Sequence, residues 1–423
     1  MARKMKDSGI EWIGEIPEGW EVVPVRSCFD EVRTKNTDGQ EQNALQFKSG
    51  NIISKSNFNA NTDDYVADTI TNYTVVLPDT VMINGLNLNY DFKSLRVALV
   101  KEKGVITSAY LAIFPDRKKI SPQYATYLFK GYETKMAFHN MGAGIRKTLG
   151  YKEFKNQPLL LPSKEEQNKI SAYLDSKCSH IDTMLFRTSS SIEEYKKLKQ
   201  AVITQAVTKG VRGEREMKDS GVEWIGEIPK EWDILNLVAH TSMLTPMRDR
   251  PENLDGPIPW IRIEDFDGKY ISSSKASLGV SKETVRSMNL KIYPVGTILC
   301  TSSCIMGKCA IVSRELVSNQ RFIGIIPDQN TCENFLYYLM LSNSERMNYL
   351  ATGALQANLS RSSFEHLKVQ FPSYQEQKEI SDYLDTKCAE IDKLIAKKEQ
   401  LVKELESYKK SLIYEVVTGK REV

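Results

Sequence analysis

Two stretches of the chain repeat apolar residues at the spacing of a long helix. In the second stretch the apolar positions follow a 3-4 pattern that is broken at Lys398 and flanked by Lys and Glu: Ile391, Leu394, Leu401, Leu405, Tyr408 and Leu412. The first carries a weaker stripe: Ile181, Met184, Thr188, Ser191, Tyr195, Leu198 and Val202. The charged flanks favour pairing of the two stripes as a coiled coil. The alternative is that each stripe packs on its own domain.

Both helices have a start signal. Ser163 is followed by Glu166, and Ser373 by Glu376, each pair just after a proline. This spacing is typical of a capping box, in which the Ser and Glu side chains satisfy free N–H groups of the first turn. In the first stretch the residues RTSSS interrupt the stripe, and Ser191 with Glu194 would cap a fresh helix after a break there.

The regions between the helices predict mixed α and β structure. Short apolar runs bounded by Gly, Pro and Asn predict strands: TVMING, SLRVALV and AYLAIF in the first region, and GTILCTSS, CAIVS and RFIGIIPD in the second. Each set is followed by a predicted helix, QYATYLFKGYETKMAFHNM in one and NFLYYLMLSNSERMNYLAT in the other. Each region is long enough for a compact domain with its own core.

The chain contains an internal repeat. KDSGIEWIGEIPEGW begins at Lys6 and KDSGVEWIGEIPKEW at Lys218, with twelve of the fifteen positions identical. The helical stretches repeat as well, as LPSKEEQNKISAYLDSKCSHID and FPSYQEQKEISDYLDTKCAEID, whereas the regions between have little in common. We therefore predict an α+β protein with four parts. These are globular domains at residues 1–160 and 215–370 and helical spacers at 161–214 and 371–423.

Composition indicates a globular protein. Of the 423 residues, 41% are hydrophobic and 26% charged, both ordinary values for a folded chain. No apolar run has the length of a membrane span, and the first residues lack the apolar segment of a signal peptide, so we expect a cytoplasmic protein. A net charge of +3 is small for a protein that would hold nucleic acid by charge alone, so any such surface must be local or shared with a partner.

Cysteine and catalytic patterns are weak. The cluster Cys300, Cys304 and Cys309 lacks the spacing of a zinc site, and buried reduced thiols are the simpler interpretation. The sequence has no HExxH, no Walker phosphate loop and no GxGxxG after a strand. Pro115-Asp116 with Glu153 and Lys155 resembles a nuclease metal site only loosely.

Several loops are rich in groups that suit base edges and phosphates. Asn and Gln amides pair with adenine, and Arg and Lys with guanine or phosphate. The candidates in the first region are Asn84, Asn87, Asn89, Lys93, Arg146 and Lys147; those in the second are Ser302, Ser303, Lys308, Gln320, Arg321, Gln356, Asn358 and Arg361. Ordinary turns also contain such residues, but their recurrence at matching places in both halves favours the functional interpretation.

The repeated KDSGxEWIGEIPxxW box, the Pro-Ser-x-x-Glu-Gln-x-x-Ile stretches and the AVTKG and VVTGK helix ends resemble the specificity subunits of type I restriction-modification systems. The resemblance spans essentially the whole chain. It implies two target-recognition domains separated by two helical regions that form an antiparallel coiled coil, with an internal pseudo-twofold repeat. The helix-pair seam would then contain Tyr195, Leu198, Val202, Leu394, Leu401, Leu405, Tyr408 and Leu412.

The resemblance implies a subunit with no chemistry of its own. It would bind a bipartite, asymmetric site in double-stranded DNA, one half-site per recognition domain, with the helices as a ruler. Two modification subunits would supply S-adenosylmethionine and methyl transfer, and restriction subunits would supply ATP- and Mg-dependent translocation and cleavage. No catalytic, cofactor or metal residue is expected on this chain, and no membrane partner. Because both halves share the box while their half-sites differ, the box would pack each domain on the helices.

Three other classes stay open on sequence alone. The chain could serve a type IIB-like assembly that cuts beside its site. It could be a scaffold whose paired helices assemble proteins and whose globular domains bind peptides. It could also be an enzyme that uses Cys304 or the Pro115-Asp116 pair.

Overall fold

The computed structural model describes residues 3–48, 50–55, 70–144, 147–246, 250–303, 307–351 and 359–423. They form two compact units, one of residues 1–189 with 400–423 and the other of residues 190–399. Each unit thus combines a globular head with part of both long helices, α5 (Lys164–Lys209) and α10 (Tyr374–Val417). The predicted domain boundaries at residues 160, 214 and 370 stay a prediction.

The first head is built on a four-stranded antiparallel sheet in the order β4-β11-β8-β9. Its strands are β1 (Met5–Asp7), β2 (Glu15–Pro17), β3 (Glu21–Pro24), β4 (Phe29–Glu31), β5 (Leu45–Lys48), β6 (Asn51–Ser54), β7 (Thr74–Val76), β8 (Val81–Ile83), β9 (Val97–Leu99), β10 (Gly104–Ile106), β11 (Leu111–Pro115) and β12 (Pro158–Leu161). Its helices are η1 (Val25–Ser27), α2 (Pro122–Thr134), α3 (Ala137–Met141) and α4 (Tyr151–Phe154).

Alternation along the strands gives this sheet two apolar faces. Val81 and Ile83 of β8 belong to the main core with α2, while Met82 belongs to a smaller cluster with Leu45 and Ile52 of the β5-β6 hairpin. Successive side chains of a strand point to opposite faces, so both faces of the sheet are covered. The hairpin therefore lies over the sheet on the side opposite α2.

The second head repeats this plan with a five-stranded sheet, β16-β23-β20-β21-β18. Its strands are β13 (Met217–Asp219), β14 (Glu227–Pro229), β15 (Asp233–Asn236), β16 (Thr241–Leu244), β17 (Ile258–Ile261), β18 (Tyr270–Ile271), β19 (Gly279–Val280), β20 (Ile298–Thr301), β21 (Cys309–Val312), β22 (Val317–Ser318), β23 (Phe322–Pro327) and β24 (Lys368–Phe371). Its helices are η2 (Leu237–Ala239), η3 (Ile263–Asp265), α6 (Lys282–Ser287), α7 (Glu333–Ser342), α8 (Ser344–Leu350) and α9 (Arg361–Glu365).

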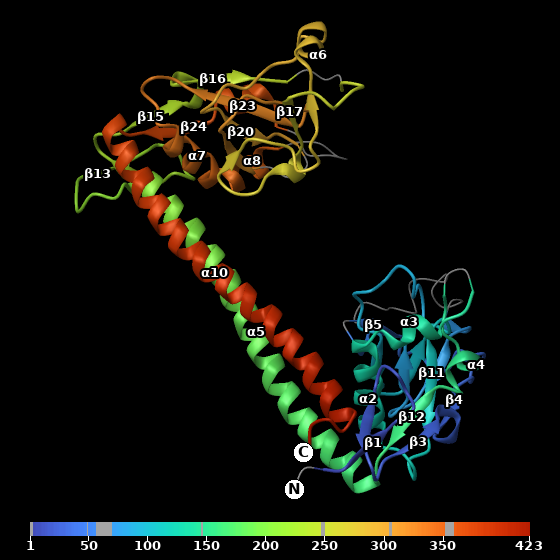
Figure 1. The fold of residues 1–423 in the computed structure, drawn as a ribbon. Helices are drawn as coiled ribbons and strands as arrows, with labels where there is room; N and C mark the ends of the chain where they lie inside the picture. The colour runs from blue at the N-terminus through green and yellow to red at the C-terminus, as the bar shows by residue number, and fades with distance from the viewer. Residues whose placement is uncertain are drawn as a thin grey trace. The chain divides into compact units, whose positions relative to one another are not determined.

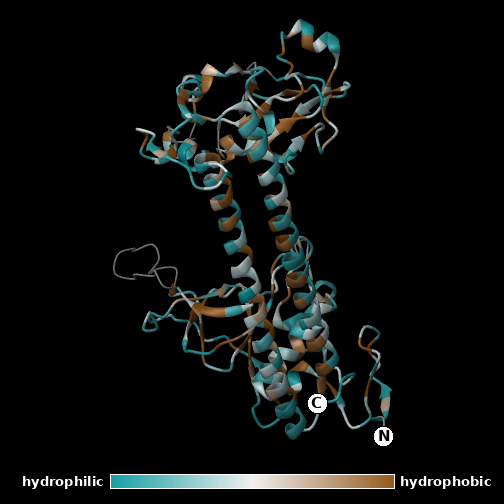
Figure 2. Ribbon diagram, turned by 90° about the vertical axis from the view of Figure 1, so that its left-hand side faces the viewer, coloured by the Kyte–Doolittle hydropathy of each residue, from teal (hydrophilic) through white to brown (hydrophobic). Residues whose placement is uncertain are grey.

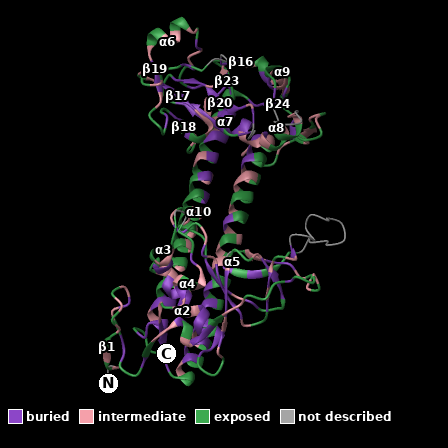
Figure 3. Cartoon of the chain, turned by 90° about the vertical axis from the view of Figure 1, so that its right-hand side faces the viewer, coloured by how far each residue is buried: buried purple, intermediate pink, exposed green. Residues whose placement is uncertain are grey.

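The predicted strands and helices of both heads are confirmed. Each long predicted helix is two shorter helices, α2 with α3 and α7 with α8, because the chain turns at Met136 with a left-handed backbone and at Asn343. Figure 3 shows buried residues along β20 and β23 at the centre of the second sheet and exposed residues on α6. Cys300 and Cys309 face each other across β20 and β21 as buried free thiols, as expected; Cys304 lies outside the described residues.

The capping serines act as predicted at the start of both long helices. The Glu166 N–H donates to Ser163 Oγ, and the Glu376 N–H donates to Ser373 Oγ, each at 3.3 Å. The predicted break near Ser191 is wrong, because α5 continues through it. Ser and Thr cost only a fraction of a kcal/mol each inside a helix, and the burial of Ile192 on the same turn favours continuity.

The helices pair antiparallel within each unit (Figure 1). In the first unit Lys409 Nζ lies 2.5 Å from Asp182 Oδ1, and in the second Lys199 Nζ lies 2.7 Å from Asp392 Oδ2. Lys199 and Lys409 occupy equivalent repeat positions, as do Asp182 and Asp392. The two ion pairs are therefore the same contact made twice, once in each unit, which confirms the internal repeat.

The inner stripe of the helices differs from the predicted seam. Tyr195, Val202 and Leu405 are partly buried and Leu412 is buried, but Leu198, Leu394, Leu401 and Tyr408 are 40 to 49% exposed. On α10 the less exposed positions are Ile395, Lys398, Val402 and Lys409. Selecting the inner positions by hydropathy excludes lysine. In the structure, however, Lys398 Nζ lies 5.6 Å from the Tyr195 ring centroid, and Lys409 pairs with Asp182. The aliphatic parts of these lysine side chains therefore occupy inner positions of α10. Figure 2 shows the mixture of hydrophilic and hydrophobic residues along both helices.

The repeated box packs each head on a helix end, as expected. Trp20 and Ile16 lie in one core with Val416 and Val417 at the end of α10. Trp232 and Ile228 lie in the other core with Ile203, Ala206 and Val207 at the end of α5. Both tryptophans are fully buried, so the box supports the fold.

The Arg next to each box also binds the start of a helix. Arg3 lies over the Trp20 ring and pairs with Glu166, and Arg215 lies over the Trp232 ring and pairs with Glu376. Glu166 and Glu376 are the glutamates of the two predicted capping boxes. Their carboxylates therefore bind arginine. The same three-residue stack occurs in both units.

Candidate nucleic-acid interface

The candidate residues cluster on equivalent loops of the two heads. In the first head, Asn84 to Lys93 lie in the connection between β8 and β9; in the second, Ser302 to Lys308 connect β20 and β21. β8 and β20 hold the same place in their sheets, next to β11 and β23. The repeated fold thus presents loops of different sequence at matching positions.

The loop of the first head is held from inside by a buried arginine. Arg96 is 1% exposed and its Nη1 donates to the carbonyl oxygens of Asn84 and Leu86, both at 2.9 Å. Its Nη2 donates to the Asp91 carbonyl oxygen. One guanidinium therefore ties both ends of the loop together, because its planar fork of N–H groups can reach several acceptors at once.

Asp91 organises the next turn of the same loop. Its Oδ1 accepts from the Lys93 N–H at 3.1 Å and the Ser94 N–H at 3.0 Å. Hydrogen bonds from the Ser94 hydroxyl and from these N–H groups, with a smaller contribution from the Arg96 charge, lower the pKa of the Asp91 carboxyl to about 2. Asp91 is therefore ionised at neutral pH and holds Lys93 and Ser94 in place.

A second candidate loop meets the first. The Leu88 N–H donates to the Lys147 carbonyl oxygen at 3.2 Å, and the Leu149 N–H donates to the Gly85 carbonyl oxygen at 2.9 Å. A side chain at Gly85 would collide with the Leu149 backbone, so this close approach requires glycine. Lys147 is exposed beside the loop, and Arg146 lies outside the described residues. Lys147 is thereby placed beside the loop of Asn87 and Asn89.

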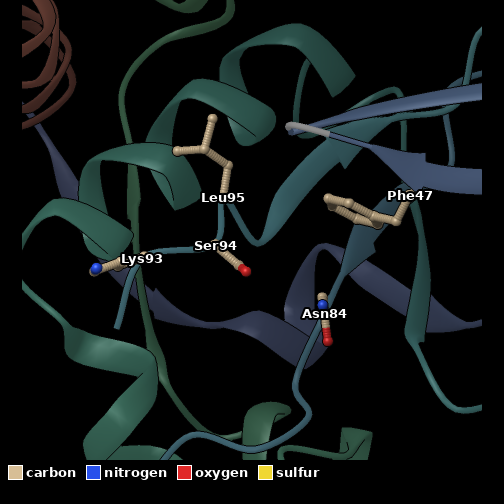
Figure 4. A pocket seen from close by; sticks show the side chains of 5 residues that line it. All are labelled: Phe47, Asn84, Lys93, Ser94 and Leu95. Carbon is tan, nitrogen blue, oxygen red and sulfur yellow. The ribbon is translucent and has the colours of Figure 1, made fainter. Parts of the chain in front are cut away.

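An open hollow lies against the first loop. It has a volume of about 370 Å³ and is lined by Phe47, Asn84, Lys93, Ser94 and Leu95 (Figure 4). Phe47 comes from the β5-β6 hairpin, and the other four come from the loop. Asn84 and Lys93 were predicted from sequence, whereas Phe47, Ser94 and Leu95 were not.

The second head gathers its candidates around the end of β20. The Ser302 N–H donates to the Arg321 carbonyl oxygen at 2.8 Å, and the Leu359 N–H donates to the Ser302 carbonyl oxygen at 2.9 Å. Lys308, Gln320 and Arg321 are exposed. The structure therefore brings segments near residues 302, 321 and 359 side by side.

The remaining candidates of this head differ in accessibility. Ser303 is 7% exposed, so its side chain faces the protein. Arg361 is exposed, but its Nε donates to Glu365 Oε1 at 2.7 Å within α9. Gln356 and Asn358 lie outside the described residues. A DNA contact by any of the named loop residues stays a prediction.

The residues that sequence reasoning missed are those that shape the loop. Arg96 reads as part of the strand-like run SLRVALV, and no local signal shows that its guanidinium turns back to the preceding loop. Asp91 could have been found from Asp-Phe-Lys-Ser, since Asp commonly accepts from N–H groups two and three residues on. Phe47 joins the site only through the tertiary fold.

The catalytic alternatives gain no support. Asp116 stabilises the turn in which it lies. Its Oδ1 accepts from the Lys118 N–H at 3.0 Å, and its Oδ2 lies 3.5 Å from Lys119 Nζ. Within the described ranges, no three His, Cys, Asp or Glu side chains gather in a way that could hold a metal ion. Over the same part of the chain, no helix is both long and apolar enough to cross a membrane.

Glu133 on α2 gives the first loop a measurable pH dependence. Burial raises the pKa of its carboxyl to about 7, although the carboxylate accepts from the Arg96 N–H. Because the folded state binds the proton more tightly than the unfolded state, stability should fall as pH rises from about 4.5 to about 7 and then level off. We expect Glu133→Gln to remove this dependence, which amounts to about 3 kcal/mol for a rise of the pKa from 4.5 to about 7.

The measurement is hydrogen exchange of β8 and β9 amides at pH values across this window, corrected for the intrinsic exchange rate. Glu102→Gln, at an exposed position of the same head, is the matched control and should leave the wild-type pH dependence in place. Equal slopes in wild type and Glu133→Gln would refute the assignment.

Comparison with known proteins shows similarity to type I specificity subunits. Residues 233–404 match the model of the type I restriction modification DNA specificity domain. The MjaX specificity subunit of a type I restriction enzyme from Methanocaldococcus jannaschii is 25% identical over 421 residues, which cover 96% of this chain and 95% of the relative.

Two solved structures share the fold. One, from a study of complex assembly and conformational transition of the type I R-M system, has a TM-score of 0.72 at 14% identity and covers 96% of this chain and 99% of its own. The HsdS subunit from Thermoanaerobacter tengcongensis has a TM-score of 0.52 at 14% identity and covers 99% and 100%.

Each of the two units combines a globular head with part of α5 and part of α10. The family model over residues 233–404 and the full-length relative show that the chain is similar to the specificity subunits of type I restriction-modification systems.

Proposed function

We propose that this chain recognises a bipartite, asymmetric sequence in double-stranded DNA, with one half-site read by each head. The observation that carries this proposal is the pair of equivalent loops, Asn84 to Lys93 and Ser302 to Lys308, on a repeated frame. The two loops differ in sequence and length, so they suit different bases. No specific observation favours the type IIB-like, scaffold or enzyme alternatives.

The chain acts as the non-catalytic subunit of a larger complex. Two modification subunits carry S-adenosylmethionine and transfer the methyl group, and restriction subunits use ATP and Mg. No cofactor is assigned to this chain. Its exposed lysines and arginines on the candidate loops contact phosphates, and the partner subunits add further charge, which offsets the small net charge of +3. We place this complex in the cytoplasm, where its DNA substrate is found.

Methylation mapping tests the proposal. Genomic DNA from cells that express this chain with its modification subunit should carry methyl groups in a two-part motif with a fixed unspecified spacer. Two different half-sites are expected because the two loops differ. A palindrome or a continuous motif would contradict the assignment of one different half-site to each head.

We further propose that the length of the helix pair sets the spacer. Inserting seven residues after Ser189 in α5 and seven after Glu399 in α10, where the chain passes between units, preserves the heptad register. Seven residues add about 10.5 Å of helix, so the spacer should lengthen by up to about three base pairs. Methylation mapping should show both half-sites unchanged. Altered half-sites would refute the proposal that the length of the helix pair sets the spacer.

A further inference from the structure

The hollow of the first head combines a polar wall and an apolar wall (Figure 4). Asn84 lies at the end of β8, and its Oδ1 accepts from the Leu86 N–H at 3.2 Å. Its amide nitrogen donates to no partner among the described residues, so two N–H groups and one further acceptor site are available for a ligand. The Asn84 side chain is therefore held in position by the Leu86 N–H, while its own N–H groups remain available to a ligand.

Phe47 forms the apolar wall. Its ring packs edge-on against Tyr110, with ring centroids 5.7 Å apart, and the hairpin carrying it lies over the sheet. The ring is only partly buried, so part of its surface faces the hollow. An aromatic side chain fixed in this way offers contact area without a large loss of conformational freedom on binding.

The two walls match one base pair better than the others. In the major groove an A·T pair presents adenine N6 and N7, which suit an Asn amide, together with the thymine methyl group, which suits an apolar side chain. A G·C pair offers no methyl group, and its guanine edge suits Arg or Lys. Lys93 lies at the rim, where a flexible charged side chain suits a phosphate.

We propose that this hollow receives the major-groove edge of an A·T pair in the half-site of the first head, with Asn84 on adenine and Phe47 on the thymine methyl group. Arg96 is the positioning residue of this site. It fixes Asn84 through the backbone carbonyl oxygen and fixes Lys93 and Ser94 through Asp91. The proposal rests on the proposed DNA-recognition function.

The Arg96 network makes the site rigid before DNA arrives. All three carbonyl oxygens that accept from its guanidinium belong to the loop, and the Asn84 N–H donates back to the Arg96 carbonyl oxygen at 2.8 Å. Lysine would keep the charge but cannot reach three acceptors from one planar group. Arg96→Lys should therefore loosen the polar wall of the hollow, while Phe47 stays packed on Tyr110 and the strands keep their pairing.

The first experiment removes single methyl groups from the DNA. The assembled complex with its modification subunits is titrated with duplexes of its mapped motif in which each thymine in turn is replaced by uracil. Loss of one buried methyl group should weaken wild-type binding about 3- to 5-fold at one position of one half-site. Phe47→Ala should bind the thymine and uracil duplexes equally at that position.

The second experiment compares loop variants by methylation mapping. Asn84→Ala should lower discrimination at the same A·T pair by about 10- to 100-fold. Arg96→Lys should relax the same half-site, and the double variant should lose no more discrimination than Asn84→Ala alone, because Arg96 acts through Asn84. Loss of stability alone would instead weaken binding to both half-sites equally.

The chain supplies its own controls. Arg117→Lys, at an exposed position of the same head, should leave the motif unchanged. Lys308→Ala with Arg321→Ala should relax the other half-site, which assigns each half-site to a head. If Arg96→Lys fails to fold, the comparison of thymine and uracil duplexes with wild type and Phe47→Ala still tests the proposal.

The outcomes separate the two proposals. A wild-type complex without a bipartite motif overturns the proposed function. A bipartite motif in which no thymine shows a Phe47-dependent methyl effect, or in which Asn84→Ala leaves both half-sites intact, overturns the A·T assignment. A G·C pair relaxed by Asn84→Ala overturns it as well.

Discussion

Replacing Trp232 by alanine is expected to lower the free energy of unfolding of the second unit by about 3 to 5 kcal/mol. The side chain is fully buried, its Nε1 donates to Glu376 Oε2 at 3.0 Å, and the Arg215 guanidinium lies 5.2 Å from its ring centroid. The substitution opens a large cavity at the junction of the box and α5. It also removes a donor from a carboxylate that is 2% exposed.

The matched control is the other tryptophan of the same box. Trp224 is 42% exposed and stacks on Arg346, so Trp224→Ala should cost no more than about 1 kcal/mol. Hydrogen exchange of β14 and α10 amides in the full chain measures both effects, because a chain of two units need not unfold in one step. Trp232→Phe serves if alanine prevents folding. Equal costs for Trp224→Ala and Trp232→Ala would show that burial in the box does not stabilise this unit.

Replacing Gln377 by alanine is expected to cost about 3 kcal/mol. Its Nε2 donates to the carbonyl oxygens of Pro372 and Asn330, and its Oε1 accepts from the Cys332 N–H at 2.8 Å. These three bonds tie the start of α10 to the start of α7, and the side chain is 1% exposed. Without them, buried backbone groups lose their partners.

The direct measurement is the amide of Cys332, whose exchange should accelerate about 100-fold, the factor that corresponds to about 3 kcal/mol. Gln375→Ala, two residues earlier on the exposed face of α10, should leave it unchanged. Gln167 makes the equivalent bonds to Pro162, Lys119 and Ser121 in the first unit, so Gln167→Ala should have the same effect there. Unaltered exchange of the Cys332 amide in Gln377→Ala would refute the conclusion that Gln377 links the start of α10 to the start of α7.

These residues show why the sequence repeats where it does. The repeated Glu-Gln pair and the repeated box form the same buried contacts in both units, so substitution in either copy would leave buried polar groups unpaired. The loop of the first head is held by contacts of its own, the hydrogen bonds of Arg96 and Asp91. The frame therefore repeats because both units use the same buried contacts, whereas the first loop depends on residues of its own head.

Sequence reasoning succeeded where local rules apply. Apolar runs predicted β8, β11, β20 and β23, and the capping serines predicted the starts of α5 and α10. It failed where packing against another helix determines the structure. The serine-rich stretch did not break α5, and lysine side chains occupy inner positions of α10 that hydropathy assigns to leucine. Packing against a second helix outweighs the small local preferences of Ser and Lys.

The sequence by itself determined the duplicated architecture, the helix starts and the resemblance to specificity subunits, and it predicted which loops to consider as candidates. Each of these depends on residues close together in the chain or on exact repetition. Only the tertiary structure decided that Arg96 holds the loop of Asn84 from inside, that Phe47 joins the same hollow, and that Ser303 faces the protein. Those facts depend on which distant groups satisfy a buried guanidinium and cover an apolar face, and sequence spacing carries no record of that choice.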